Sequence, residues 1–186
     1  ERSRGLGDVY KRQGVTVGAH PSYDDRANFG RLNQNLSKAE LVALLTYQLG
    51  AIQALCVQSG VTLRYVKPHG ALYNQAATDS TLARVLAETI ASFDERLAIM
   101  GLAGSALITA GREYGLATIS EAFADRRYNA DGTLVARGVA GAVIDDAKQA
   151  LSQVKQMIEA GTVTAITGET VTLQADSTCF HGDNDH

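Results

Sequence analysis

The stretch Leu63-Arg64-Tyr65-Val66-Lys67-Pro68-His69-Gly70-Ala71-Leu72-Tyr73-Asn74 joins a short β-type run to a strongly helical segment. The β-type run covers residues 63–66, and ionisable and aromatic side chains follow it where a strand would open into a loop. In α/β proteins, ligands bind at that junction. A single histidine there is more often held by local hydrogen bonds, so His69 alone does not establish a site.

Histidine recurs at the ends of two other strand-like runs. Residues 15–19 lead into His20, and residues 177–180 lead into His181. Helical patterns separate at least five strand positions, and such alternation predicts a parallel sheet, either open or closed as a barrel. Polar residues follow nearly every strand, so we favour a (β/α) barrel in which these residues share one rim.

Helix boundaries and buried faces can be read from the same pattern. Ser37 and Glu40 form a capping box before a helix that runs to Gly60, and Asp79 or Thr78 and later Asp145 or Asp146 are expected to cap further helices. The first helix is expected to bury Leu41, Leu45, Leu49, Ile52, Leu55 and Cys56. The last helix is expected to bury Ala147, Leu151, Val154 and Ile158.

Length and composition limit the possible classes of protein. The length of 186 residues favours one domain. The formal net charge of -3 gives no sign of the basic surface that nucleic-acid binding needs. No apolar run is expected to reach the roughly 20 residues of a membrane span. Cys56 and Cys179 show no metal or disulfide spacing, which predicts reduced thiols and a cytoplasmic location. Residues 1–13 are interpreted as a non-native leader, and residues 14–186 as the domain.

Several side chains could carry chemistry at the shared rim. The three histidines could bind a divalent metal or transfer protons near neutral pH together with nearby carboxylates; the set is His20, His69, His181, Asp24, Asp25, Asp125 and Asp183. No sequential metal motif supports the first of these roles.

The basic side chains each have two interpretations. Lys67 could neutralise a carboxylate or phosphate or pair with a neighbouring acid, and in an ideal strand it would point away from His69. Arg126 could hold a substrate carboxylate with Asp125 orienting it, or the two could form a solvated surface pair. Arg31 could be delivered to the site by the long loop of residues 20–35. A nucleophilic Cys179 is the minority interpretation.

Six segments in chain order resemble the LamB/YcsF family, the A subunits of bacterial 5-oxoprolinases. They are Val17-Gly18-Ala19-His20-Pro21-Ser22-Tyr23, Phe29-Gly30-Arg31, Val66 to Asn74, Gly101-Leu102-Ala103-Gly104-Ser105, Glu121-Ala122-Phe123-Ala124-Asp125-Arg126 and His181-Gly182-Asp183. The resemblance implies an α/β fold, a TIM-like (β/α) barrel of the glycoside hydrolase/deacetylase type. It also implies ATP-dependent opening of the 5-oxoproline lactam to glutamate, with Mg²⁺ accompanying ATP and with subunits B and C as partners.

The resemblance also implies roles for individual residues and shows where this sequence departs from the family. It implies catalytic roles for His20, Lys67, His69, His181 and Asp183, with the three histidines as possible metal ligands, and substrate-binding roles for Arg31, Tyr73, Asp125 and Arg126. The family's opening strand and its final helix have no counterpart here, so we expect a fragment whose barrel is incomplete at both ends. Two alternatives remain open: a metal-dependent, deacetylase-like amide hydrolase that needs no ATP, and a non-catalytic substrate-binding subunit.

Overall fold

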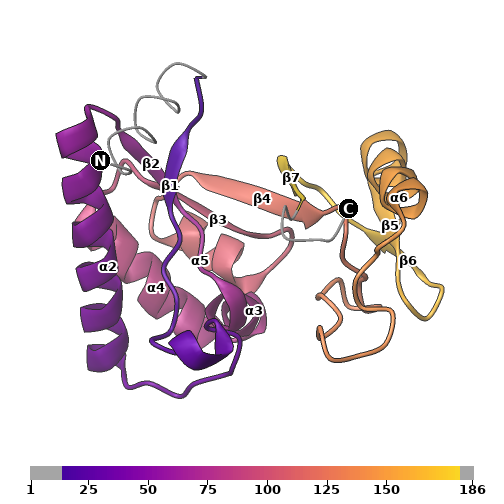
Figure 1. Cartoon of the computed structure of the whole chain (residues 1–186), viewed down its shortest axis with the longest axis horizontal. Helices are drawn as coiled ribbons and strands as arrows, with labels where there is room; N and C mark the ends of the chain where they lie inside the picture. Colours follow the sequence, from indigo (N-terminus) through magenta and orange to yellow (C-terminus); the bar gives the residue numbers. More distant parts are fainter. Residues whose placement is uncertain (1–13, 181–186) are drawn as a thin grey trace.

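A curled parallel sheet forms half a barrel in the structure, a computed structural model that describes residues 14–180 (Figure 1). Its strands, in spatial order, are β1 (Val17–Ala19), β2 (Leu63–Val66), β3 (Ala98–Leu102), β4 (Thr118–Phe123) and β7 (Ser177–Cys179). Every neighbouring pair is parallel. The carboxyl ends of all five strands therefore meet at one edge, as the predicted shared rim requires.

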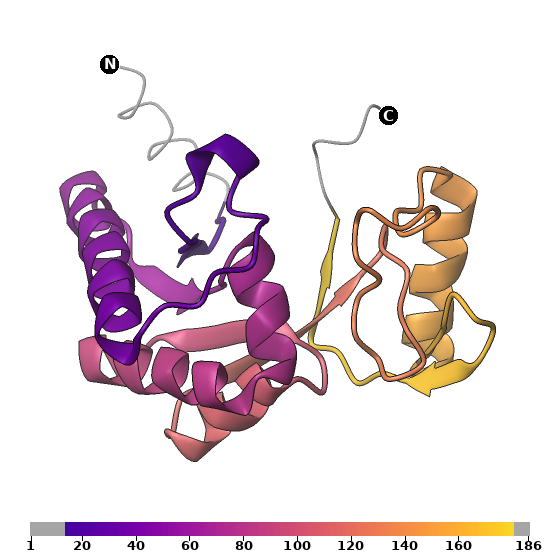
Figure 2. The ribbon, with the colours of Figure 1, turned by 90° about the horizontal axis from the view of Figure 1, so that it is seen from below.

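Helices connect the strands and cover the sheet (Figures 1 and 2). They are α2 (Lys38–Ser59), α3 (Gly70–Thr78), α4 (Ser80–Phe93), α5 (Ala106–Glu113) and α6 (Ala147–Ala160), with a short 3-10 helix, η1 (Arg26–Asn28). The predicted capping box of Ser37 and Glu40 is present, and Asp79 and Asp146 cap α4 and α6. The main core lies between the sheet and helices α2 to α5.

Helix α2 differs from the prediction in two respects. No apolar run of membrane-spanning length was expected, but α2 carries no charged residue after Glu40 and is long and apolar enough to cross a membrane. Core helices of soluble proteins can have the same length and composition. Its buried face is Leu41, Leu45, Leu49 and Cys56, and this face packs into the main core. Leu55, predicted to be buried, is 53% exposed.

The chain leaves the half-barrel after β4 and builds a second lobe, which lies beside β4 and β7 in Figure 2. This lobe contains α6, the antiparallel hairpin of β5 (Thr162–Thr164) and β6 (Thr170–Thr172), and a tight turn, where the amide of Asn129 donates to the carbonyl of Thr133 at 2.8 Å. Residues from both lobes form a second hydrophobic cluster.

The predicted inward face of α6 is wrong, because this helix packs on the second lobe and not on the sheet. Leu151 and Ile158 are 69% and 76% exposed, whereas Gln153 and Met157 are buried. The Nε2 atom of Gln153 lies 2.9 to 3.1 Å from the carbonyl oxygens of Phe123, Ala124 and Arg126. A buried amide is therefore favoured over an apolar side chain, because it satisfies carbonyls that no longer pair in the sheet.

Candidate functional site

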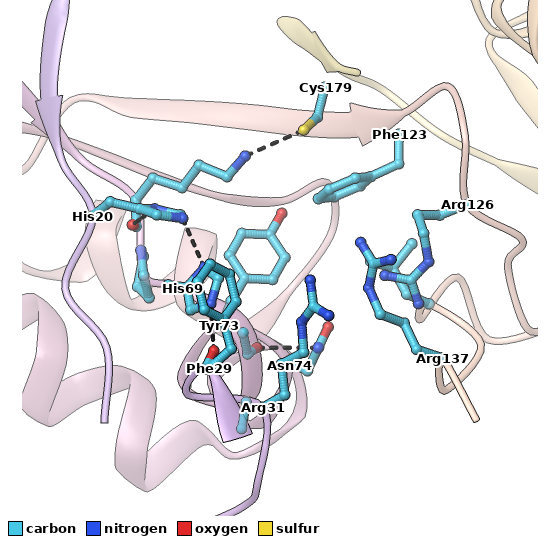
Figure 3. Close-up of a pocket in the computed structure, with 15 residues that line it drawn as sticks. His20, Phe29, Arg31, His69, Tyr73, Asn74, Phe123, Arg126, Arg137 and Cys179 are labelled. Atoms are coloured by element: carbon cyan, nitrogen blue, oxygen red, sulfur yellow. Dashed lines mark hydrogen bonds between the residues drawn. The ribbon is translucent and has the colours of Figure 1, made fainter. Parts of the chain in front are cut away.

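A cavity of about 500 Å³ opens at the carboxyl edge of the sheet (Figure 3). His20 follows β1, Lys67 follows β2, and Phe123 and Cys179 end β4 and β7, and all four line the cavity. Tyr73, Arg31 and Arg126 line it as well. His69 also lines the cavity, beside Lys67. The expectation that Lys67 and His69 point to opposite sides is wrong, because residues two apart in an extended segment share a face.

His20 and His69 form a hydrogen-bonded pair whose protonation follows from its neighbours (Figure 3). The Nδ1 atom of His20 lies 2.7 Å from the carbonyl oxygen of Lys67, and Nε2 of His69 lies 2.8 Å from that of Phe29. A carbonyl only accepts, so both nitrogens carry protons. The two inner nitrogens, Nε2 of His20 and Nδ1 of His69, are 3.0 Å apart. With both outer nitrogens as donors, a hydrogen bond between the two inner nitrogens needs one further proton, which either ring can carry.

The loop after β1 holds His69 in this orientation. Phe29 adopts a left-handed backbone with φ of 56° and lies edge-on to the His69 ring, with 5.1 Å between centroids. The amide of Ala71 donates to the carbonyl oxygen of Gly30 at 2.9 Å. Gly70 has φ of +57°, and a Cβ atom on it would lie 2.5 Å from that same oxygen. Only glycine lets the start of α3 approach the loop this closely.

Lys67 is held by a carboxylate that lies beneath the cavity. Its Nζ atom is 2.5 Å from Oε1 of Glu121, whose other oxygen accepts a hydrogen bond from the hydroxyl of Tyr73 at 3.0 Å. The Glu121 side chain is 3% exposed. Burial alone would lower the pKa of Lys67, but Glu121 outweighs burial and the pKa is raised. Burial and Glu121 both raise the pKa of Tyr73. At neutral pH Lys67 is therefore an ammonium and Tyr73 a neutral phenol.

Cys179 lies at the edge of this network. Its Sγ atom is 3.4 Å from Nζ of Lys67. Burial, the largest influence, raises the pKa of the thiol, and the lowering influence of Lys67 does not reverse the shift. A raised pKa keeps the sulfur protonated at neutral pH, which disfavours the nucleophilic role. Cys179 and Cys56 are both free cysteines.

Arg126 and Asp125 are inside the protein and do not form a solvated surface pair. They are 4% and 2% exposed, and Nη2 of Arg126 donates to the carbonyl of Val135 at 2.5 Å. Burial and the neighbouring guanidinium of Arg137 lower the pKa of Arg126 to about 10, against the opposing effect of Asp125. Arg126 therefore remains charged at neutral pH and lines the cavity.

The sequence patterns do not single out Glu121 or Arg137 as site residues. Glu121 lies within one of the segments that resemble the family, and its carboxylate is buried because β4 extends to Phe123. Arg137 reaches the cavity from the irregular segment after β4, which local sequence patterns do not position. His181 and Asp183 lie outside the described residues. Within residues 14–180, no group of three or more potential ligands from His, Cys, Asp and Glu is arranged to hold a metal.

Comparisons with known proteins agree with this architecture. The model of the LamB/YcsF family matches residues 6–186. The 5-oxoprolinase A subunit from Histophilus somni (strain 129Pt) is 54% identical over 176 residues, which cover 95% of this chain and 71% of the relative. The 5-oxoprolinase A subunit from Neisseria meningitidis serogroup C (strain 053442) is 53% identical, with coverage of 95% and 72%.

A crystal structure shows a similar fold. The lactam utilization protein from Thermus thermophilus superposes with a TM-score of 0.87 at 37% identity, covering 97% of this chain and 73% of that protein. The match of the family model over nearly the whole chain and the high identity to curated relatives lead to one assignment. The chain belongs to the LamB/YcsF family.

Proposed function

We propose that this chain functions as the A subunit of a 5-oxoprolinase, an enzyme that hydrolyses the lactam of 5-oxo-L-proline to L-glutamate. The observation that carries the proposal is the 3.0 Å contact between the inner ring nitrogens of His20 and His69 inside a cationic cavity, in a chain 54% identical to a 5-oxoprolinase A subunit. Opening a lactam requires a proton for the departing nitrogen and stabilisation of negative charge on oxygen. In this proposal the histidine pair supplies the proton and the cationic side chains stabilise the negative charge.

ATP, with Mg²⁺, is proposed as the second substrate, because an unstrained lactam carbonyl is a poor electrophile. Transfer of the γ-phosphoryl group to the lactam oxygen releases ADP and activates the ring carbon. Water then adds to that carbon, the C–N bond breaks, and the nitrogen takes a proton, which leaves an acyl phosphate. A second water releases phosphate and completes glutamate. The positive charges of the cavity suit every anionic species in this sequence.

The residues take complementary roles in this proposal. The His20–His69 pair donates its shared proton to the ring nitrogen as the C–N bond breaks and recovers it from the attacking water. Lys67, held by Glu121, stabilises negative charge on the reacting oxygen. Arg31 and Arg126, with Asp125 beside Arg126, bind the anionic groups of the substrate, and Tyr73 lines the same wall. His181 and Asp183 are proposed to complete the site from outside the described residues.

A metal-dependent amide hydrolase without ATP is the second candidate. One observation favours it, because the inner nitrogens of His20 and His69 face each other and fit a divalent metal in place of their shared proton. Such a metal would supply Lewis-acid activation of the carbonyl. A third ligand would come from outside the described residues, and His181 is the predicted one.

Three further features belong to the proposal. The half-barrel is part of a TIM-like barrel of the glycoside hydrolase/deacetylase type, an assignment that the fold of the lactam utilization protein supports. The chain works with subunits B and C, which the naming of its relatives as A subunits supports. We keep the cytoplasm as the predicted location, consistent with two free cysteines.

The test is reconstitution of the complete protein with candidate B and C subunits, assayed for glutamate formation and ADP release from 5-oxoproline and ATP. The proposal expects both products only when all three subunits, ATP and Mg²⁺ are present. Amide hydrolysis by this protein alone, without ATP and abolished by a chelator, would replace the proposal with the metal-dependent hydrolase. Full turnover after replacement of His20, His69 and His181 together would assign the protein a binding role only.

A further inference from the structure

Three arginines from separate segments line the cavity. Arg31 follows η1, Arg126 follows β4, and Arg137 belongs to the irregular segment beyond it. Figure 3 shows the head groups of Arg126 and Arg137 side by side, facing the side from which Arg31 reaches. Lys67 is separate from this group, because Glu121 already pairs with it.

Arg126 gives the evidence that this part of the cavity is built to receive a ligand. The residue is 4% exposed, and its Nε atom is buried without a hydrogen-bond partner among the described residues. A buried donor without a partner is costly, more so on a charged group, so such atoms are rare and call for an explanation such as a bound anion. Arg126 lines the cavity, so an anion there would supply the missing acceptor.

The charges of the group point to the class of ligand. Arg137 and Arg31 both lower the pKa of Arg126, after the larger effect of burial, because each guanidinium repels the positive charge of Arg126. One carboxylate fits a single guanidinium fork, as in ordinary arginine–carboxylate pairs. Three converging guanidinium groups fit a group with several terminal oxygens and two negative charges, which phosphoryl groups provide.

We propose that Arg31, Arg126 and Arg137 form a binding site for a phosphoryl group. The inference deepens the proposed function, on which it rests only for the source of the ligand, namely the acyl phosphate formed during lactam opening. The phosphate of that intermediate would lie against the arginines, with its acyl carbon directed toward the histidine pair across the cavity. Inorganic phosphate, the final product of the same step, shares this chemistry and serves as the probe.

Calorimetric titration at constant ionic strength tests the site directly. Inorganic phosphate is expected to bind at least about tenfold more tightly than acetate, because acetate carries one charge and two oxygens. Arg137→Gln and Arg31→Gln are each expected to weaken phosphate binding by about tenfold or more. Arg112→Gln on α5 removes the same charge from an exposed position away from the cavity and should change nothing.

The outcomes separate this site from the proposed function. Phosphate binding that is lost in both arginine variants supports the site, even in a protein that fails to turn over 5-oxoproline. Equal affinity for phosphate and acetate would overturn it, as would equal binding by Arg31→Gln, Arg137→Gln and Arg112→Gln. Arg31 lies on an exposed loop, so its variant keeps the test valid if Arg137→Gln does not fold.

Discussion

A contact of 2.5 Å between Nζ of Lys67 and Oε1 of Glu121 joins the end of β2 to β4, and β3 lies between these two strands in the sheet. The two residues are 54 positions apart in the chain, and the pair also ties Tyr73 of α3 to β4. Lys67 supplies the carbonyl oxygen that fixes His20, so the ion pair and the histidine pair share one backbone segment. The order of the candidate site therefore depends on this buried pair.

Removing the charge of Glu121 should destabilise the fold. Glu121→Gln leaves the ammonium of Lys67, 19% exposed, without its partner, and breaking a buried pair costs about 3 kcal/mol. Urea unfolding measures the loss. The control is Glu113→Gln, which breaks the exposed Arg84–Glu113 pair at a cost below about 1 kcal/mol. Equal losses of unfolding free energy in the two variants would show that the buried Lys67–Glu121 pair stabilises the fold no more than an exposed pair does.

The contribution of the Lys67–Glu121 pair to the free energy of unfolding should disappear at alkaline pH. The folded-state pKa of Lys67 lies above its ordinary value of 10.5, because Glu121 outweighs burial. When folding raises the pKa of a cationic group, the group stabilises the fold fully at pH values below its pKa in the unfolded state. This stabilisation is lost as the pH rises through its pKa in the folded state. The stability difference between wild type and Glu121→Gln should therefore be constant from about pH 7 to 9 and shrink above about 10.5. A difference that grows with pH would contradict this account.

Cys179 should react slowly with alkylating reagents near neutral pH. Burial raises the pKa of its thiol, so the thiolate forms only at alkaline pH, and labelling by iodoacetamide should accelerate as pH rises above about 9. Mass spectrometry separates Cys179 from the buried Cys56. In the reconstituted enzyme, Cys179→Ala should retain turnover within about tenfold, whereas complete loss would restore the nucleophilic role.

Gly70→Ala should disturb the loop that orients His69. A left-handed backbone costs a non-glycine residue about 1–2 kcal/mol, and the new Cβ would also approach the backbone oxygen of Gly30. Gly104→Ala is the matched control, because Gly104 also has positive φ but has open space around it. Thermal unfolding should show a clearly larger loss for Gly70→Ala. Equal losses would show that the close approach of loop and helix does not matter.

Local chemistry in the sequence predicted much of the fold. The capping side chains of Ser37, Asp79 and Asp146 act on amides within three residues of themselves, so their roles could be read from the chain alone. The run 63–66 matched β2 at both ends. The α6 face could not be predicted, because its partner is the irregular segment after β4, which no periodic pattern describes.

The candidate site was predictable where it follows strand ends and not where it depends on tertiary contacts. His20 and His69 meet because parallel strands bring their carboxyl ends together. The pairing of Lys67 with Glu121 depends on how far β4 extends, and Arg137 depends on the path of an irregular segment. These relationships are set by packing between distant segments, which sequence spacing does not record.

The central claim is that the His20–His69 pair carries proton transfer in lactam opening. Its most direct test is 5-oxoproline turnover by the complete protein with His69→Ala, assembled with subunits B and C, beside Glu113→Gln as a control for substitution away from the cavity. The account predicts that His69→Ala lowers kcat by at least about 100-fold, a typical contribution of a general acid or base, while the control keeps wild-type turnover. Normal turnover by His69→Ala would contradict it.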